Sequence, residues 1–157
     1  MTWGSGKPLL MAGIRKSSTA KPGGDDMSDE GNKKKVGSIE WRDLTVENAE
    51  EIRDFYSEVV GWEHTAASMG EYDDFNMNLP ADGETIAGIC HARGGNAALP
   101  NQWLMYVRVE DVHESVDRCR ALGGTVLDGP KGMGSILFCV IKDPQGAVLA
   151  LISDKPG

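Results

Sequence analysis

The sequence predicts an α+β domain in which two tandem β-α-β-β-β modules form a curled mixed sheet shaped like a cup. The first observation is an internal repeat: residues near 41–89 recur, position by position, near 104–152, at an offset of 63. A period longer than the roughly 20–50 residues of solenoid repeats, present only twice, indicates a duplicated compact module. The second observation is that both copies carry the same order of strand, helix and turn signals.

The first module begins at residues 38–46, where side chains alternate as in a half-buried strand. Asn48 then predicts a helix N-cap, and Glu51 completes a capping box. Gly61 ends the helix, and three strands follow near 63–67, 71–79 and 84–92. The helix has one apolar stripe, formed by Ile52, Phe55, Tyr56, Val59 and Val60.

The second module repeats this plan. A strand is predicted over residues 103–109, a helix begins at the cap Asp111, and Gly123 and Gly124 end it after residue 122. The later strands are predicted near 125–127, 135–141 and 147–152, with a hairpin turn at 143–146. Each four-stranded set is thus backed by one helix, and the opposite faces are expected to line a cavity between the modules.

Composition divides the chain into a leader and one domain. Residues 1–36 lack periodicity and are expected to be a disordered leader, within which Met27 is an alternative start and the basic stretch weakly resembles a transit peptide. Residues 37–155 form a single domain, with module one at 37–93 and module two at 101–153. No apolar run approaches the roughly 18 residues that span a bilayer, so we expect a cytoplasmic protein.

Charge and cysteine content narrow the classes of partner. The net charge is −8, and because residues 1–36 carry +3, the remainder carries −11. An acidic body repels phosphate backbones and anionic lipid, so we expect no nucleic-acid or membrane partner and a small-molecule ligand instead. Cys90, Cys119 and Cys139 lie in apolar segments and are interpreted as buried reduced thiols.

Several short motifs carry a family resemblance: WRDLTV at 41–46, DFY at 54–56, VGW at 60–62, WLMYV at 103–107, LGG at 122–124 and DPQGA at 143–147. Together they resemble the vicinal oxygen chelate (VOC) superfamily, which includes glyoxalase I, bleomycin-resistance proteins and extradiol dioxygenases. The resemblance covers about residues 37–153 and implies the glyoxalase/bleomycin resistance/dioxygenase fold. It also implies homodimerisation as one way in which modules pair.

The resemblance implies metal-ligand positions that this chain does not fill. Carried onto this sequence, the positions on the first and last strands of the modules are Trp41, Leu104, Ala87 and Ala150. None of these side chains has the oxygen, imidazole or thiolate donors that divalent ions require. We therefore expect no metal and no other cofactor, with a divalent ion held by relocated ligands as the open alternative.

The predicted cavity has an aromatic and apolar lining with a few polar groups, the composition of a small-molecule pocket. Its expected ligand-binding residues are Trp41, Asp43, Ala87, Leu104, Tyr106, Arg108 and Ala150. The competing interpretation is that the large side chains simply fill the space. The Gly-rich segment at 127–134 is either a surface turn or a loop that closes over the cup.

These observations support a binding protein of the bleomycin-resistance kind, which takes a small, partly aromatic or cationic compound without metal. The alternative is a metal-dependent lyase or dioxygenase that resembles glyoxalase I. A metal-independent enzyme with Asp43 as its base, and a partner-binding module that has lost the pocket, also remain open. No catalytic residue is assigned from the sequence.

Overall fold

The computed structural model describes residues 35–156. The predicted leader up to residue 34, including Met27, lies outside the described residues. The elements, in chain order, are β1 (Ile39–Val46), α2 (Ala49–Val60), β2 (Glu63–Ser68), β3 (Asp73–Asn78), β4 (Thr85–His91), the 3-10 turn η1 (Gly94–Asn96), β5 (Trp103–Arg108), α3 (Val112–Ala121), β6 (Thr125–Met133), β7 (Ile136–Lys142) and β8 (Val148–Asp154).

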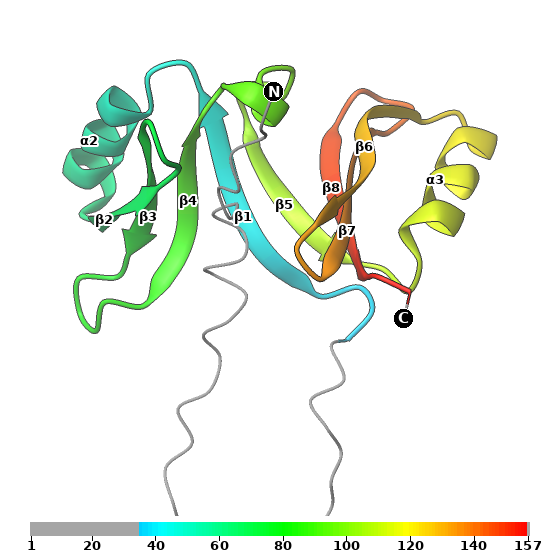
Figure 1. The fold of residues 1–157 in the computed structure, drawn as a ribbon, viewed down its shortest axis with the longest axis horizontal. Coiled ribbons are helices and arrows are strands. Elements are labelled where there is room, and N and C mark those ends of the chain that lie inside the picture. Colours follow the sequence, from blue (N-terminus) through cyan, green and yellow to red (C-terminus); the bar gives the residue numbers. More distant parts are fainter. Residues whose placement is uncertain (1–34, 157) are drawn as a thin grey trace, which may run out of the picture.

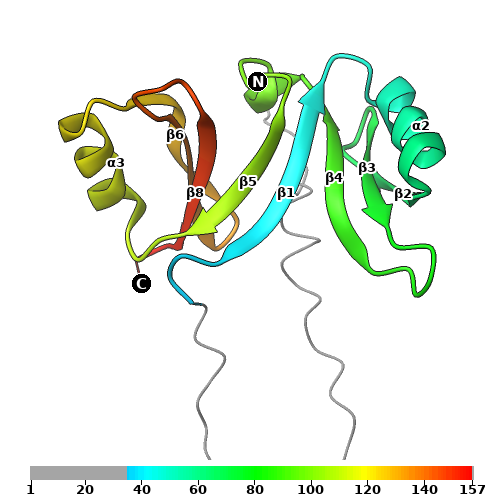
Figure 2. The ribbon, with the colours of Figure 1, turned by 180° about the vertical axis from the view of Figure 1, so that it is seen from behind.

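The eight strands form one mixed sheet in the order β2-β3-β4-β1-β5-β8-β7-β6. Within each half the first and last strands are parallel, β1 with β4 and β5 with β8, and the two halves join through the antiparallel pair β1 and β5. Figures 1 and 2 show the sheet bent at this central pair, with α2 and α3 on its outer flanks. The predicted fold class, two tandem β-α-β-β-β modules in a curled sheet, is confirmed.

The central strand pair lies on a local two-fold axis that relates the two modules. Arg42 pairs with Met105, and these positions differ by the repeat offset of 63. On either side of this pair, Trp41 lies opposite Tyr106, and Asp43 lies opposite Leu104. The repeat therefore brings equivalent positions of the two modules together at the centre of the sheet.

The predicted helix boundaries are confirmed by their caps. The Asn48 side chain accepts a hydrogen bond from the Glu51 backbone N–H at 3.2 Å and donates to the Glu51 carboxylate at 3.0 Å. In the second module, Asp111 accepts from the Glu114 backbone N–H at 3.0 Å. Gly61 ends α2 at a φ of 83°, a left-handed conformation that glycine adopts without steric cost.

The Gly-rich segment is neither a surface turn nor a closing loop. Residues 125–133 form β6, which pairs with β7 through two register irregularities, between Val126 and Asp128 and between Asp128 and Lys131. Its glycines therefore allow the strand to bend while it stays in the sheet. The hairpin turn at 143–146 forms as predicted, with the Asp143 carboxylate accepting from the Gln145 N–H at 2.8 Å and Gly146 at a φ of 97°.

Three apolar clusters form the core. One packs between α2 and the sheet and includes Leu44, Phe75 and Ile89, and a second packs between α3 and the sheet around Val116 and Leu151. The third lies on the sheet face opposite the helices, the concave face. Its buried members are Trp41, Cys90, Leu99, Leu104, Tyr106, Ile136, Phe138, Val140, Ala150 and Ile152.

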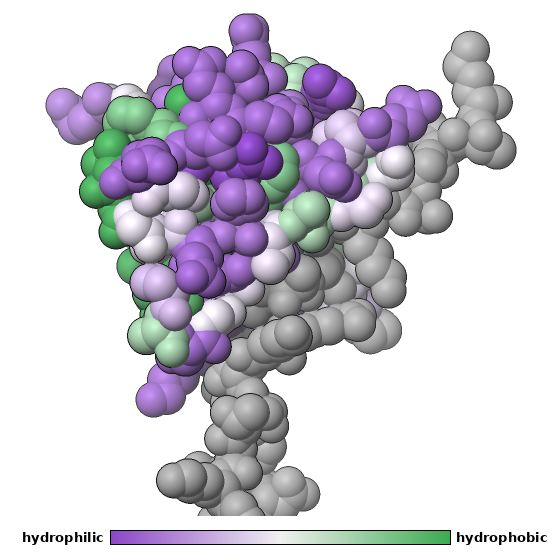
Figure 3. Space-filling view, turned by 90° about the vertical axis from the view of Figure 1, so that its left-hand side faces the viewer, coloured by the Kyte–Doolittle hydropathy of each residue, from purple (hydrophilic) through white to green (hydrophobic). Residues whose placement is uncertain are grey.

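The predicted apolar stripe of α2 is only partly covered. Ile52 and Tyr56 pack against the sheet, whereas Phe55 and Val59 are 52% and 64% exposed. Figure 3 shows this side of the molecule as mostly hydrophilic, with an apolar area along one edge. Among residues 35–156, no helix is long and apolar enough to cross a membrane.

Candidate functional site

The concave face of the sheet is the candidate site, and β1 supplies its central residues. Along this strand, Leu44 faces α2 and belongs to the cluster beneath that helix. Because neighbouring side chains on a strand point to opposite faces, Trp41, Asp43 and Thr45 face the concave side. All three are buried, and Trp41 belongs to the concave cluster.

Asp43 and Tyr106 form a buried hydrogen-bonded pair at the centre of this face. The Tyr106 hydroxyl lies 3.0 Å and 3.1 Å from the two Asp43 carboxylate oxygens and donates to this carboxylate. Their side chains are 5% and 3% exposed. Tyr106 also stacks on Phe138, with 5.6 Å between ring centroids, so β7 fixes the position of the phenol ring.

Burial dominates the electrostatics of this pair. It raises the pKa of Asp43 from 3.8 to about 7, against the opposing effects of the Tyr106 hydroxyl and then the Trp41 indole. The nearby Asp74 carboxylate raises the pKa of Asp43 further. Burial, and then the Asp43 charge, raise the pKa of the Tyr106 phenol well above its usual value. Near neutral pH, Asp43 can therefore either donate or accept a proton.

Two buried polar atoms on the concave face have no hydrogen-bond partner among the described residues. These atoms are Trp41 Nε1 and Asn76 Oδ1, and a third, Ser57 Oγ, belongs to α2. The Trp41 N–H nevertheless acts on the Asp43 carboxylate, whose pKa it lowers as a hydrogen-bond donor does. Buried polar groups are nearly always paired in folded proteins, so an unpaired donor and acceptor on one face require an explanation.

Most of the predicted lining residues meet on the concave face. Leu104, Tyr106 and Ala150 belong to the same cluster as Trp41, and Tyr106 pairs with Ala150 across the parallel strands β5 and β8. Asp43 lies opposite Leu104 across the central strand pair. Thus the structure brings together five of the seven predicted residues: Trp41, Asp43, Leu104, Tyr106 and Ala150.

Ala87 lies on the other face of the sheet. It packs in the cluster beneath α2, next to Leu44 and Ile89. The reason is that equivalent residues on the last strands, β4 and β8, are 62 positions apart, whereas those on the first strands, β1 and β5, are 63 apart. Asp43 pairs with Gly88, whereas its equivalent Tyr106 pairs with Ala150, so the offset there is 62. A one-residue change in register reverses the facing of every side chain on a strand.

Arg108 is held in ion pairs and does not extend the Asp43 site. Its Nε and Nη2 donate to the two carboxylate oxygens of Glu40, the latter at 2.9 Å. Nη1 donates to Asp154 at 3.2 Å. The side chain is 3% exposed, so the guanidinium links the ends of β1, β5 and β8. Through these ion pairs, Arg108 stabilises the sheet.

The residues present do not fit the divalent metal ion that the resemblance implies. Trp41, Leu104, Ala87 and Ala150 offer no donor atoms, and Ala87 lies on the wrong face. Within residues 35–156, no group of three or more His, Cys, Asp and Glu side chains is arranged to hold a metal ion. Asp43 is the one carboxylate that β1 directs toward this face, and its neighbour is a phenol.

Sequence reasoning missed the polar residues that β3 contributes. Asp74 and Asn76 alternate with the α2-facing Phe75 and Met77. This period-two pattern was a readable signal for a strand with one polar buried face. Asp74 is almost fully buried, and Asn78 on the same strand face is satisfied by Thr65 and Thr85 through hydrogen bonds of 3.3 Å and 2.8 Å.

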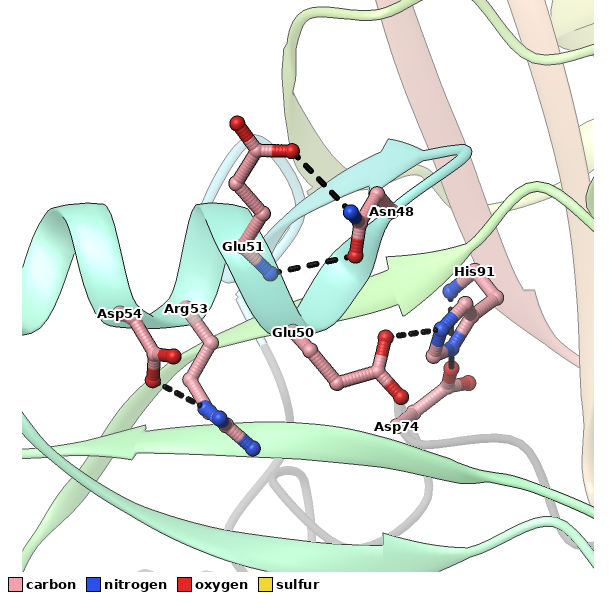
Figure 4. A network of polar contacts seen from close by, with 7 residues as sticks. All are labelled: Asn48, Glu50, Glu51, Arg53, Asp54, Asp74 and His91. Carbon is pink, nitrogen blue, oxygen red and sulfur yellow. Dashed lines mark hydrogen bonds and ion pairs between the residues drawn. The ribbon is translucent and has the colours of Figure 1, made fainter.

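His91 belongs to a second polar network, between α2 and the sheet (Figure 4). Its Nε2 lies 2.8 Å from the Glu50 carboxylate, and its Nδ1 lies 3.2 Å from that of Asp74. Asp74 also accepts from the His91 backbone N–H at 2.8 Å. Burial raises the pKa of Asp74, while the hydrogen bonds from His91 oppose the shift. The buried histidine thus fastens the start of α2 to β3 and β4.

A surface pocket of about 630 Å³ adjoins this network. Its residues come from α2, β2, the turn between β2 and β3, β3 and the segment after β4: Glu50, Arg53, His64, Ala66, Glu71, Tyr72, Asp73, Phe75 and Arg93. The Arg53 guanidinium lies over the Phe75 ring, and that of Arg93 lies over Tyr72. Both cations are thus already stacked on the aromatic walls. This pocket was not predicted from the sequence.

Cys90 is a buried thiol, as predicted, and lies on the concave face. Burial raises its pKa well above the usual value, and the carboxylates of Asp43 and Asp74 act in the same direction. Its sequence neighbour His91 faces α2. The two side chains are therefore not a nucleophile and base pair.

Solved structures with similar folds were found at low sequence identity. Methylmalonyl-CoA epimerase from Streptomyces coelicolor, in complex with 2-nitronate-propionyl-CoA, is 15% identical with a TM-score of 0.46, covering 78% of this chain and 100% of the epimerase. A glyoxalase/bleomycin resistance protein/dioxygenase superfamily member from Vibrio splendidus 12B01 is 14% identical with a TM-score of 0.48, covering 73% and 97%.

Sequence relatives and a family model give the assignment. Proteins named "Putative glyoxylase CFP32", from Mycobacterium bovis and Mycobacterium tuberculosis, are 27% identical over 122 residues, which are 77% of this chain and 46% of theirs. The match thus spans less than half the length of these relatives. Residues 43–152 match the model of the glyoxalase-like domain. The chain therefore belongs to the glyoxalase-like domain family, within the VOC superfamily that its motifs resemble.

Proposed function

We propose that this glyoxalase-like domain binds a small organic molecule against the concave face of its sheet, and that it does so without a divalent metal ion. The observation that carries the proposal is the buried pair of Asp43 and Tyr106 beside the unpartnered Trp41 Nε1. If Asp43 and Tyr106 served only as part of the hydrophobic core, apolar side chains would be expected at their positions.

The chemistry of the pair supports a ligand site. Its carboxyl group has a pKa of about 7, far from the usual value, and perturbed groups of this kind cluster at functional sites. The surrounding Trp41, Tyr106 and Phe138 supply aromatic area. Aromatic walls with a few convergent polar groups are typical of small-molecule pockets. Binding of this kind amounts to sequestration or carriage, as in a bleomycin-resistance protein.

A metal-dependent lyase or dioxygenase is the alternative that family membership and the name of the mycobacterial relatives favour. The absence of donor atoms at Trp41, Leu104, Ala87 and Ala150 argues against it, because the ion would lack its usual ligands. Fold membership alone does not establish a reaction.

The test is a thermal-shift screen of the full chain against a small-molecule library, run in parallel with a chelator and with added nickel, zinc, iron or manganese. Elemental analysis of the purified protein accompanies it. We expect compounds that stabilise the chain in chelator, and that lose their effect in Asp43→Ala. Asp73→Ala, which removes an exposed carboxylate, is the matched control. Stoichiometric bound metal, or stabilisation that requires added metal in every case, would contradict the proposal.

A further inference from the structure

An apolar band crosses the face of the sheet that carries the helices, from α2 to the start of β1. We call it the convex band, and its members are Ile39, Phe55, Val59, Trp62, Trp103 and Met105. Four of these side chains remain 46–64% exposed, namely Ile39, Phe55, Val59 and Met105. Apolar side chains that stay exposed as one patch mark an interaction surface.

Aromatic contacts join α2 to β5 within the band. The centroid of the Tyr56 ring lies 5.2 Å from that of Phe55 and 5.3 Å from that of Trp103. The Trp62 ring lies 6.0 Å from that of Trp103. The Trp103 Nε1–H donates to the Tyr56 hydroxyl at 3.0 Å, which fixes this junction. The exposed part of α2 is thus continuous with the half-buried start of β5.

The band continues along β5 to β1. Met105 follows Trp103 by two residues, so both side chains point to the face that carries the helices. Val107 is next in this row, and it pairs with Leu151 of the cluster beneath α3 on one side and with Ile39 on the other. Because α2 and α3 cover the flanks of this face (Figures 1 and 2), the centre of the sheet at Met105 and Ile39 stays exposed.

Acidic side chains border the convex band along α2. Glu51 lies four residues before Phe55 and Glu58 lies three residues after it, so both are its neighbours on the helix surface. Glu63 follows Trp62 at the start of β2. All three acidic residues are exposed, and within the part of the chain that the structure describes none of them forms an ion pair. The band is therefore apolar at its centre and negative along one border.

A second copy of this chain is a poor match for the band. Residues 37–157 carry a net charge of −11, because residues 1–36 carry +3 and the whole chain carries −8. Two such bodies repel each other where their acidic borders meet. Arg42, which pairs with Met105 on this face, already donates from Nε to the Ile86 carbonyl at 2.7 Å. The band therefore favours an occupant that brings positive charge together with apolar surface.

The chain itself contains a segment of this chemistry at residues 7–16, which lie outside the described residues. The segment reads KPLLMAGIRK, with an apolar run between one basic residue at its start and two at its end. The sequence has no acidic residue before Asp25. The composition of the segment thus complements the band, with apolar side chains against apolar ones and basic against acidic.

The connection between this segment and β1 is long enough to reach α2. Residues 16 and 35 are 35 − 16 = 19 positions apart. A chain of this length spans up to about 60 Å when it is extended, whereas a domain of about 120 residues is roughly 35 Å across. The connection also enters the domain beside Ile39, at one end of the band. A tethered segment is present at an effective concentration on the order of millimolar.

We propose that the convex band is a docking surface for an apolar segment with basic ends, and that residues 7–16 of this chain occupy it. The apolar run covers Phe55, Val59 and Met105, and the basic ends face the acidic border of α2. This inference goes beyond the proposed ligand binding, because the band and Asp43 lie on opposite faces of the sheet.

Methyl NMR of the full chain tests whether the segment occupies the band. The wild type is compared with the double variant Leu9→Asp/Leu10→Asp, which we call the leader variant. Two charges in the apolar run oppose its burial against an apolar surface. We therefore expect the methyl signals of Ile39, Val59 and Met105 to differ between the two proteins.

The control adds the same two charges outside the segment, in Thr19→Asp/Ala20→Asp. We expect this control to leave the signals of the band unchanged. The signals of Ile136, in the concave cluster, should be the same in all three proteins. Band signals that do not differ between the wild type and the leader variant, or that move equally in the control, overturn the proposal.

A fluorescent synthetic peptide of residues 7–16 measures the same contact. In the wild type the tethered segment competes with the peptide, whereas in the leader variant the band is free. We expect the peptide to bind the leader variant about tenfold more tightly than the wild type. Equal affinity for the two proteins, or no binding to the leader variant, overturns the assignment of residues 7–16.

Two further changes, made in the leader variant, map the docking surface. Val59→Ser removes an apolar side chain of the band, and Glu51→Gln/Glu58→Gln neutralises its acidic border. Each is expected to weaken peptide binding about three- to tenfold. Leu122→Ser, at an apolar position that is 78% exposed after α3, is the matched control and should have no effect. Circular dichroism confirms that each variant is folded. Peptide affinity that Val59→Ser and Leu122→Ser leave equally unchanged would place the contact elsewhere and overturn the proposal.

Analytical ultracentrifugation of the wild type and Val59→Ser distinguishes the segment from a second copy as the occupant. We expect the two proteins to sediment alike at every concentration. A dimer of the wild type that Val59→Ser dissociates would mean that a second copy covers the band, and would overturn the proposal.

Discussion

Replacing Asp43 by Asn removes the buried ionisable group and keeps its size and one acceptor for the Tyr106 hydroxyl. The pKa of Asp43 is about 7 in the fold, against 3.8 for an ordinary aspartate. The folded protein therefore keeps this proton over a pH range in which the unfolded chain has released it. Stability consequently falls as pH rises from about 4 to about 7, and is level above that. At about 1.4 kcal/mol per pKa unit, the full cost is on the order of 4 kcal/mol.

The assay is urea unfolding of the wild-type protein and Asp43→Asn at pH 5 and pH 8. By the same linkage relation, the wild type loses about 2.5 kcal/mol of stability between these pH values through Asp43 alone. The variant avoids this loss, so its stability relative to the wild type should increase by about that amount. Asp73→Asn makes the same chemical change at an exposed position and serves as the control. If the free energies of unfolding of the wild type and Asp43→Asn differ by the same amount at pH 5 and at pH 8, the reasoning is refuted.

Three further outcomes follow from the contacts. Tyr106→Phe removes the hydroxyl that donates to Asp43; it should lower unfolding free energy at pH 8 by about 1–2 kcal/mol, with a smaller loss at pH 5. Arg108→Met leaves the Glu40 carboxylate without its guanidinium partner. Thermal and urea unfolding should show that the free energy of unfolding falls by about 3 kcal/mol. A fall below about 1 kcal/mol would mean that the ion pair is dispensable. Asn48→Ala removes the cap of α2 and should cost about 1 kcal/mol by urea unfolding, with no cost if the cap is supplied elsewhere.

The fold was predictable because its signals are local. The caps Asn48 and Asp111, the helix stop at Gly61 and the Asp143 turn all depend on residues within a few positions of each other, and the structure has each of them. The length of β6 was not predictable in this way. Its Gly-rich sequence favours a turn locally, and its pairing with β7 across the register irregularities determines the strand instead.

The candidate site was predictable only where the repeat offset holds. At the central strands the offset of 63 correctly placed Trp41, Asp43 and Tyr106 on one face. At β4 the offset changes to 62, so Ala87 was assigned to the wrong face. The ion pairs of Arg108 were not predictable for a related reason, since its partners Glu40 and Asp154 come from two other strands. Register and distant pairings are properties of the assembled sheet and leave no short-range trace in the sequence.

Asp43 and Tyr106 occupy equivalent positions in the two modules, one repeat of 63 residues apart, and they contact each other across the two-fold axis. In a duplication product with identical halves, such a position meets its own copy. Two aspartates there would repel in a buried setting, so that one of them would have to hold a proton. With a phenol in one module and a carboxylate in the other, the contact is instead a donor and acceptor pair. The difference between the two modules at this position thus gives the centre of the sheet a hydrogen bond with one direction, from Tyr106 to Asp43.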